Sequence, residues 1–395
     1  MSHTLISRSP DLKHLRDDGY DIIVSNGFLQ VRDIPYLNAA KEVKRGIIVS
    51  TLELVDDITP TDGVKDHTVR FAGDEPCDSG GEPLVNIINS SSNDEIIPGL
   101  TVNHSFSSKP AGGYKNYYDK SVAYIAMLEN QAHVIDPSVT AKTFPLILND
   151  EQEASVFKYV DTASSRADIS VISEKLKQTS VAIVGLGGTG SYVLDFVAKT
   201  PVKEIHIFDA DKMQQHNAFR VPGALSGDEI KAASSKVAYH AGLYSKLRDG
   251  IAIHEEFVDA SNVDLLKPMD FIFLCLDDGN AKQILVNSLE KWERPFIDVG
   301  MGIYKIGDSL AGTLRTTSSS DAMRDHRSKK DRIPFTDDKT NEYSKNIQIV
   351  ELNALNAALA VIKWKKFLTF YNDLEKEHFS LYEIDGNSMI NEDSP

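Results

Sequence analysis

The chain has 395 residues, of which 41% are hydrophobic, and a formal net charge of −16. This acidic balance argues against nucleic acid and anionic membrane surfaces as partners, because both bind clustered lysine and arginine side chains. Cys77 and Cys275 are the only cysteines, which excludes a disulfide framework and a zinc site built on paired cysteines.

The length predicts about two or three domains with their own hydrophobic cores. The longest apolar runs, such as VAIVG and FIFLCL, are far shorter than the ~20 residues that span a bilayer. The opening residues, MSHTLISRSPDLKHLRDD, lack the apolar segment of a secretory signal peptide. We therefore expect a cytoplasmic protein.

Residues 1–150 contain short runs with β-propensity, namely DIIV, FLQV, GIIVSTLELV and HTVRF, which glycine, proline, aspartate and serine interrupt. A helix is expected near Tyr117 to Asn130. This pattern predicts an α+β domain. It carries no motif of its own, so partner docking, or an inactive copy of the domain that follows, is the expected role.

Residues 151–395 alternate strands and amphipathic helices. Strands are expected at VAIVG, EIHIFD, IAIHEEFV, DFIFLCL and PFIDVG, and helices from Gly188, near Glu229 to Leu247 and near Ala281 to Lys291. This alternation predicts an α/β domain with a Rossmann-like, mostly parallel sheet and helices on both faces. The polar residues at about 316–345 predict a crossover loop, followed by a long helix over 346–371 and a short strand near Phe379 to Ile384.

A glycine turn follows the first strand of this second region. Gly185, Gly187 and Gly190 form a Gly-x-Gly-x-x-Gly pattern, with Gly188 between them, and glycine lets phosphates approach the N–H groups of a helix N-terminus. The next strand ends at Asp209, where a carboxylate can accept the hydroxyls of a ribose. An aspartate that only caps a turn is the alternative. The pattern indicates a nucleotide site, and an NAD-dependent oxidoreductase is one interpretation.

Asp211, Asn217 and Arg220 follow Asp209 in the spacing D-x-D-x(5)-N-x-x-R, which an ordinary dinucleotide enzyme does not need. From about residue 155 to the C-terminus the chain thereby resembles the adenylating domain of ubiquitin-activating enzymes and their bacterial relatives, the ThiF family. The resemblance implies that ATP is the nucleotide. It also implies that Arg220 and the loop glycines contact its phosphates.

The resemblance further implies a phosphate-binding lysine and a magnesium ligand. Lys236 matches the lysine, with Lys231 as the fallback, and a solvated helix lysine is the alternative. In the run LCLDDGNAK, Asp277 matches the Mg²⁺ ligand, because Lys282 then falls where the family usually has arginine. Asp278 is the other candidate, and at least one of the two aspartates is expected to be a helix N-cap.

Members of the family also use an arginine from a preceding helix, often on the opposite protomer. Arg166 resembles it, which implies a homodimer, although a structural pairing with Asp161 or Asp168 would explain the same residue. His216 lies beside the motif and could contact the nucleotide or have a packing or solvent role.

The implied reaction is attack of a substrate carboxylate on the α-phosphate of ATP. In ubiquitin-activating enzymes the acyl group then moves to a cysteine, and this chain has none in its crossover segment. Thr340 falls near the position of that cysteine, and Ser344 and the run Thr316 to Ser320 are further candidates for an oxyester. Direct transfer to a partner's thiol or amine is one alternative, and the loss of a cysteine through an engineered substitution is another. Each of these hydroxyl residues could also be an ordinary polar loop residue. Cys275 is expected to be a structural core residue, and Cys77 to lie in an exposed turn whose acidic neighbours raise its pKa.

The runs LISRSPDLKHLRDDGYDI, VPGALS and NIQIVELNALNAALAVIKWKK carry a further resemblance. Residues 1–150 resemble an uncharacterised domain that precedes ThiF-type enzymes in bacterial operons of a ubiquitination-like pathway. The resemblance implies two partners, a ubiquitin-like protein as substrate and a conjugating-enzyme-like protein as acceptor. Adenylation of a small-molecule or peptide carboxylate, and a non-catalytic scaffold, are the alternative functions.

Overall fold

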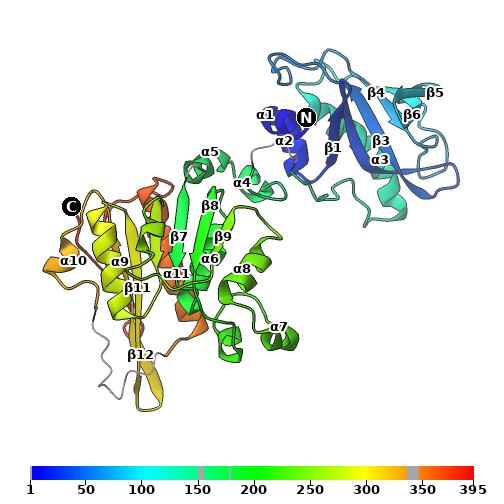
Figure 1. Ribbon diagram of the computed structural model, residues 1–395. Helices are drawn as coiled ribbons and strands as arrows, with labels where there is room; N and C mark the ends of the chain where they lie inside the picture. The colour runs from blue at the N-terminus through cyan, green and yellow to red at the C-terminus, as the bar shows by residue number, and fades with distance from the viewer. Residues whose placement is uncertain (1, 150–154, 178, 336–346) are drawn as a thin grey trace. The chain divides into compact units, whose positions relative to one another are not determined.

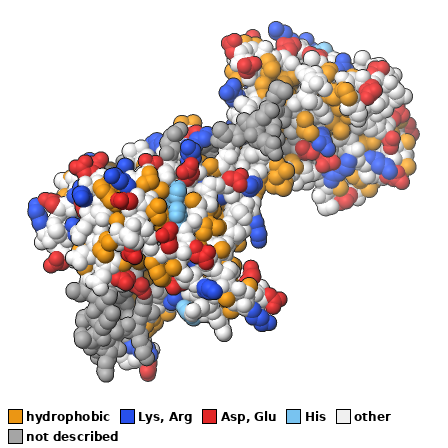
Figure 2. Space-filling view, viewed as in Figure 1, with side chains coloured by type: hydrophobic (Ala, Val, Ile, Leu, Met, Phe, Trp, Pro, Cys, Tyr) orange, Lys and Arg blue, Asp and Glu red, His pale blue; other side chains and the backbone are white. Residues whose placement is uncertain are grey.

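The computed structural model describes residues 2–149, 155–177, 179–335 and 347–395. The chain divides into two compact units, Met1–Ala154 and Ser155–Pro395, which are drawn in Figure 1. Among the described residues, no helix has both the length and the apolar character needed to cross a membrane. On the face seen in Figure 2, acidic and basic side chains are interspersed.

The N-terminal unit is an antiparallel sheet with helices. The strands lie in the order β1-β2-β3-β4-β6-β5. Their bounds are β1 (Asp21–Ser25), β2 (Phe28–Leu37), β3 (Val43–Thr51), β4 (Thr68–Ala72), β5 (Ile88–Ile97) and β6 (Leu100–Ser107). The helices are α1 (Ser2–Arg8), α2 (Pro10–Asp17) and α3 (Tyr117–Ile135). The fold is α+β, as predicted.

Helix α3 forms where the sequence predicts a helix, and it continues beyond Asn130. It begins after Asn116, whose side chain accepts a hydrogen bond from the backbone N–H of Asp119 at 2.8 Å. Tyr117, Tyr124 and Leu128 of its buried face pack into the core beneath the sheet. Helices α1 and α2 are not predicted from the sequence.

The C-terminal unit is built on one large mixed sheet. Its eight strands lie in the order β14-β13-β12-β11-β10-β7-β8-β9. The five strands from β11 to β9 are parallel, and β12, β13 and β14 continue the sheet in antiparallel pairs. The bounds are β7 (Ser180–Val184), β8 (Glu204–Phe208), β9 (Ile251–His254), β10 (Phe271–Leu274), β11 (Phe296–Ile306), β12 (Ser309–Ser319), β13 (Phe379–Glu383) and β14 (Ser388–Glu392).

Helices cover both faces of this sheet (Figure 1). The side chains of β7 are apolar on both faces of the sheet. Val181 and Ile183 belong to one hydrophobic core, and Ala182 and Val184 belong to a second core on the other face. The first core includes α6 (Gly188–Ala198), α8 (Lys236–Tyr244) and α11 (Val350–Phe367). The second includes α9 (Gly279–Lys291). This is the predicted Rossmann-like arrangement.

The remaining described elements are short. They are α4 (Thr162–Arg166), α5 (Ser170–Ser173), α7 (Gly227–Ala232) and α10 (His326–Lys329), with single 3₁₀ turns η1 (Glu174–Leu176), η2 (Gln215–Phe219) and η3 (Val263–Leu266).

Two expectations about this unit are wrong. The crossover loop does not begin at residue 316, because residues 316–319 are buried in β12. The helix expected near Glu229 to Leu247 is two helices, α7 and α8. Ala233 takes a left-handed conformation with φ +47° between them, and the side chain of Ser235 caps α8 by accepting from Ala238 N at 3.3 Å.

Candidate functional site

A cavity of about 860 Å³ lies at the edge of the sheet where the parallel strands β7, β8 and β10 end. Open α/β sheets bind ligands at this edge. The cavity brings together most of the residues that the sequence predicts for the site: Gly185, Gly187, Gly188, Asp209, Asp211, Arg220, Lys236 and Asp277. Gly190, Asn217 and Arg166 are not among the lining residues.

The glycines of the turn have different physical roles. Gly185 has φ +91°, and a Cβ there would lie 2.7 Å from the carbonyl oxygen of Cys275. A Cβ on Gly190 would lie 1.9 Å from the carbonyl oxygen of Gly185, so this glycine is required for packing. A Cβ on Gly187 would meet nothing within 4 Å. Gly187 therefore leaves space that a bound ligand can use.

Asp209 ties the glycine turn to the strand beside it. One carboxylate oxygen accepts from the backbone N–H of Leu186 at 2.7 Å, and the other from that of Asp211 at 2.8 Å. Lys236 Nζ lies 3.4 Å from Asp209 Oδ2 and 2.6 Å from Asp211 Oδ2. The Lys236 side chain is only 9% exposed, so it is a buried cation held by two carboxylates and not a solvated helix lysine.

Arg220 is a second cation on the cavity wall. Its Nε atom is buried and has no hydrogen-bond partner among the described residues. Burial lowers the pKa of Arg220, and the negative charge of Asp277 partly offsets this effect. A partly buried guanidinium whose buried Nε donor is unused is suited to an anionic ligand.

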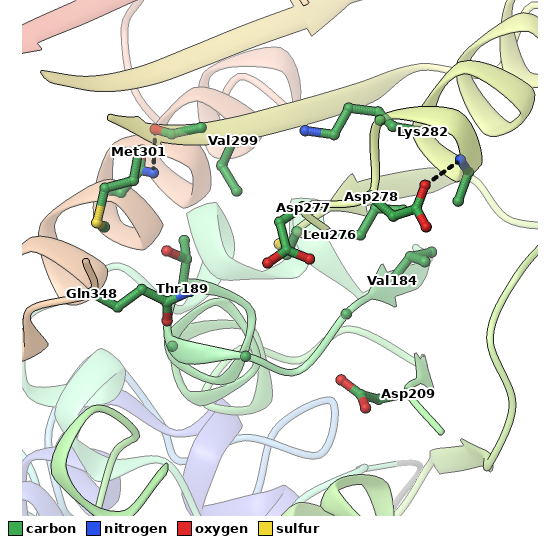
Figure 3. Close-up of a pocket in the computed structure, with 18 of the residues that line it drawn as sticks. Val184, Thr189, Asp209, Leu276, Asp277, Asp278, Lys282, Val299, Met301 and Gln348 are labelled. Carbon is green, nitrogen blue, oxygen red and sulfur yellow. Dashed lines mark hydrogen bonds between the residues drawn. The ribbon is translucent and has the colours of Figure 1, made fainter. Parts of the chain in front are cut away.

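The two neighbouring aspartates after β10 have separate tasks, as Figure 3 shows. Asp278 is the N-cap of α9, and its carboxylate accepts from the backbone N–H of Ala281 at 2.9 Å. Asp277 points into the cavity from the same strand end. The N-cap role expected for one of the pair thus falls to Asp278, and Asp277 has the position suited to a metal-bound phosphate.

Sequence reasoning singled out Lys282 but missed the two charged residues that it lies with, Asp298 and Arg315. Asp298 of β11 is fully buried between Lys282 Nζ at 2.9 Å and Arg315 Nη2 at 2.6 Å. Lys282 and Arg315 both line the cavity, whereas Asp298 lies behind them. The antiparallel β11–β12 hairpin brings Asp298 and Arg315 together, and no local sequence pattern signals that pairing.

Helix α11 also contributes residues that sequence reasoning missed. Asn353 is fully buried, its Oδ1 accepts from Thr189 Oγ1 at 3.1 Å, and a Cβ on Gly188 would lie 2.1 Å from its Nδ2. Asn356, one turn later, donates to the carbonyl oxygen of Gly300 at 3.0 Å. Two asparagines on the buried face of an otherwise apolar helix were the available signal.

The remaining predicted residues lie apart from the cavity. Asn217 is buried and accepts from the backbone N–H of Gln214 at 2.9 Å, which fixes the turn before Arg220. Arg166 is exposed at the end of α4. His216 is exposed and is not a lining residue. Thr340 and Ser344 lie outside the described residues.

Neither cysteine is suited to carry an acyl group. Cys275 lines the cavity, but burial raises its pKa, and the nearby charge of Asp298 raises it further. Cys77 is not in an exposed turn as expected. It is fully buried, its backbone N–H donates to Leu37 O at 2.8 Å, and burial is the main cause of its raised pKa, with Glu75 adding to it.

Asp277 could serve a hard cation that also binds phosphate. Among the residues that the structure describes, no three or more histidine, cysteine, aspartate or glutamate side chains form a metal-binding group. Mg²⁺ differs from zinc here, because it is commonly held by one or two carboxylates together with substrate phosphates and water. The single carboxylate of Asp277 therefore fits Mg²⁺ brought in by a nucleotide.

Comparison with known proteins identifies relatives of both units. Residues 10–162 match the model of a domain of unknown function, DUF6791. The chain is 26% identical over 138 residues to ubiquitin-like modifier-activating enzyme 5 of Drosophila grimshawi, covering 31% of this chain and 34% of the relative. It is 24% identical over 135 residues to SUMO-activating enzyme subunit uba-2 of Caenorhabditis elegans, covering 33% of this chain and 23% of the relative.

The chain thus spans about a third or less of these curated relatives. Among solved structures, Escherichia coli MccB with ATP is 17% identical, with a TM-score of 0.42, over 58% of this chain and 67% of that one. The match that coincides with the cavity is the one to the ThiF family. It covers residues 166–305, from the end of α4 to β11, so the C-terminal unit contains a ThiF-family domain.

Proposed function

We propose that the C-terminal unit binds ATP in the large cavity and adenylates the C-terminal carboxylate of a ubiquitin-like protein. One observation carries the proposal. Within a region that matches the ThiF family, the cavity is lined by the buried Lys236 and the partly buried Arg220, together with Gly187 and Asp277. Such a set of groups is suited to a nucleotide triphosphate.

The reaction needs no nucleophile from the protein in its first step. A carboxylate oxygen of the substrate forms a bond to the α-phosphorus of ATP. The bond from that phosphorus to the bridging oxygen breaks, and pyrophosphate leaves. Arg220 and Lys236 would accelerate the step by orienting the phosphates and neutralising negative charge that builds up in the transition state.

The charge of the cavity supports a magnesium cofactor. Six carboxylates and four basic side chains line it: Asp209, Asp211, Glu256, Asp259, Asp277 and Asp278 against Arg220, Lys236, Lys282 and Arg315. A triphosphate adds further negative charge, so we propose that it binds as its Mg²⁺ complex. Asp277 would hold the ion, which would supply additional charge neutralisation at the phosphates.

We propose that the acyl group leaves the adenylate without a thioester on this chain. The raised pKa of the Cys275 thiol, which favours its protonated form, and the burial of Cys77 support this route. The conjugating-enzyme-like partner is the proposed acceptor, either directly or after an oxyester on Thr340 or Ser344. Residues 316–319 are excluded as carriers because they are buried in β12.

The proposal also assigns a role to the N-terminal unit and an oligomeric state to the chain. We propose that the DUF6791 unit docks the ubiquitin-like protein or the acceptor. The exposed position of Arg166 is compatible with a role on the opposite protomer of a homodimer, where it would contact the phosphates.

The test is ATP–pyrophosphate exchange with a panel of carboxylates. The panel contains ubiquitin-like proteins with free C-termini, the same proteins with amidated C-termini, short peptides and single amino acids. Exchange with the free C-termini alone is the expected result. Exchange with a peptide or an amino acid would instead favour the small-carboxylate function, whereas affinity for NAD and none for ATP would favour an oxidoreductase.

A further inference from the structure

A second cavity, of about 540 Å³, lies in the C-terminal unit. Ser320, which follows the last residue of β12, lines it together with His378, Lys366, Phe367 and other residues. Thr313 and Arg315 of the same strand line the first cavity. Ser320 is five positions beyond Arg315, which corresponds to about 17 Å of extended chain.

Ser320 and His378 form a hydrogen-bonded pair at this cavity. Ser320 Oγ lies 2.8 Å from His378 Nε2, and His378 Nδ1 lies 3.1 Å from the carbonyl oxygen of Lys376. A carbonyl oxygen can only accept, so Nδ1 carries the proton. Nε2 is then an acceptor, and the Ser320 hydroxyl donates to it.

Backbone contacts hold both members of the pair in place. The backbone N–H of His378 donates to the carbonyl oxygen of Asp393 at 2.9 Å, and its carbonyl oxygen accepts from Ser318 N at 2.8 Å. Ser320 exchanges two backbone hydrogen bonds with Met323, at 3.1 and 3.0 Å. The geometry of the pair is therefore built into the fold.

A charged network fixes the turn that orients His378. Asp373 accepts from the backbone N–H of Lys376 at 3.1 Å, and its carboxylate pairs with Lys363 at 3.0 Å and Lys366 at 3.2 Å. This network holds the carbonyl of Lys376 at the histidine. A nucleophile, a base and a group that orients the base are the parts of an activated serine.

The imidazole is in the protonation state that such a pair needs. His378 is 3% exposed, and burial lowers its pKa, with the charge of Lys363 lowering it further. The ring is therefore neutral at neutral pH and can take the proton of Ser320.

We propose that Ser320 and His378 form a second reactive site, in which the Ser320 hydroxyl attacks activated esters small enough for the 540 Å³ cavity. The Ser320 Oγ–carbon bond forms, and the bond from the acyl carbon to the leaving oxygen breaks. The hydroxyl proton passes to His378 Nε2 and then to the leaving oxygen. Phe367 and Tyr371 line the cavity, which favours an aliphatic or aromatic acyl group.

This site is independent of the proposed adenylation. Ser320 follows the end of β12, five positions beyond Arg315, which lines the first cavity, and the serines and threonines at 316–319 between them are buried. The two cavities have no described lining residue in common, so acylation of Ser320 by an added ester does not require the first cavity. Failure of one proposal leaves the other unaffected.

The test is covalent labelling of the full chain with an alkyl fluorophosphonate, followed by peptide mass spectrometry. Attack by Ser320 forms an oxygen–phosphorus bond and releases fluoride. We expect one adduct on Ser320, none in Ser320→Ala, and labelling slowed about 100-fold or more in His378→Gln, because a general base contributes at least that factor. Ser380→Ala is the matched control, because this β13 serine donates a hydrogen bond to Asn391 and not to a histidine. Labelling of Ser320 in this variant should proceed at the unmodified rate.

The pH dependence of labelling in the unmodified chain is a second readout, which requires no variant. The labelling rate of the unmodified chain should be flat from neutral to alkaline pH and should fall in acid as His378 becomes protonated. No adduct on Ser320, or the same rate in a folded His378→Gln protein, would overturn the proposal. A rate that keeps rising through alkaline pH would also overturn it, since that profile indicates an unassisted hydroxyl.

Discussion

Lys236 makes two hydrogen bonds to Asp211, one through its side chain and one through its backbone. Nζ lies 2.6 Å from Oδ2 of Asp211, and the backbone N–H of Lys236 donates to the carbonyl oxygen of Asp211 at 2.8 Å. These bonds anchor the start of α8 beside the strand end that carries Asp209. An ammonium group has three donors, so Lys236 keeps one for a ligand after its two carboxylate contacts.

Lys236→Ala should weaken ATP binding by about 10- to 100-fold, because a hydrogen bond between charged groups contributes about 1.5–3 kcal/mol. Isothermal titration calorimetry measures the change. Lys231→Ala is the matched control, since this lysine is 81% exposed on α7 and the substitution removes the same charge. Equal losses in the two variants would mean that only net charge matters.

Gly187→Ala and Gly190→Ala should separate binding from packing. Gly187 has φ −70°, which alanine adopts, and its Cβ would meet open space, so the variant should fold normally and bind ATP more weakly. Gly190→Ala should lower the free energy of unfolding by about 3 kcal/mol or more, because its Cβ would collide with backbone. Urea denaturation and calorimetry measure both effects. Unchanged ATP affinity in Gly187→Ala would contradict the position assigned to the phosphates.

Asp278→Ala should cost about 1 kcal/mol of stability through loss of the N-cap of α9. Asp278→Asn keeps a capping oxygen and should restore most of that loss. Asp277→Ala should leave the urea midpoint close to that of the unmodified chain while it removes the dependence of ATP binding on Mg²⁺. A larger stability loss in Asp277→Ala than in Asp278→Ala would reverse the two assignments.

The chain should lose stability in mild acid because of His240. This histidine is fully buried, both ring nitrogens lack hydrogen-bond partners among the described residues, and burial next to Lys236 lowers its pKa to about 4. The unfolded chain binds the proton near pH 6.5, so stability is complete above that pH and falls as the pH drops toward 4. The loss from this one group is about 2 kcal/mol by pH 5.

Urea denaturation at pH 7.5 and pH 5 tests this prediction in the unmodified chain and in His240→Leu. The variant should lose about 2 kcal/mol less between the two pH values. It should keep some acid sensitivity, because burial also lowers the pKa of His326 to about 4. An equal loss in both proteins would show that His240 does not titrate between the folded and unfolded states in this range.

Local sequence patterns predicted β7, the glycine turn after it and the end of β8, which line the cavity. The strand, the glycine turn and the strand-end aspartate around Gly185 and Asp209 follow one another closely in the chain. Their relative positions can therefore be predicted from short sequence spacings. The division of labour between Asp277 and Asp278 required the structure, because both directly follow the same strand. Sequence offsets alone could not distinguish the cap from the cavity residue.

Residues brought in by distant segments could not be predicted. Arg315 reaches the cavity only because β12 turns back along β11, and Asn353 reaches the glycine turn only because α11 packs on α6. The prediction that Cys77 lies in an exposed turn was wrong for a similar reason. Its acidic, glycine-rich surroundings are typical of an exposed turn, yet a bridge to Leu37 buries it.

The most direct test of the central claim is to identify the products formed from ATP when the full chain is incubated with a ubiquitin-like protein that has a free C-terminus. Adenylation predicts AMP and pyrophosphate in the unmodified chain, exchange of labelled pyrophosphate into ATP, and loss of both in Asp277→Ala. Formation of ADP and phosphate instead, or exchange at the unmodified level in Asp277→Ala, would contradict an adenylation site at this cavity.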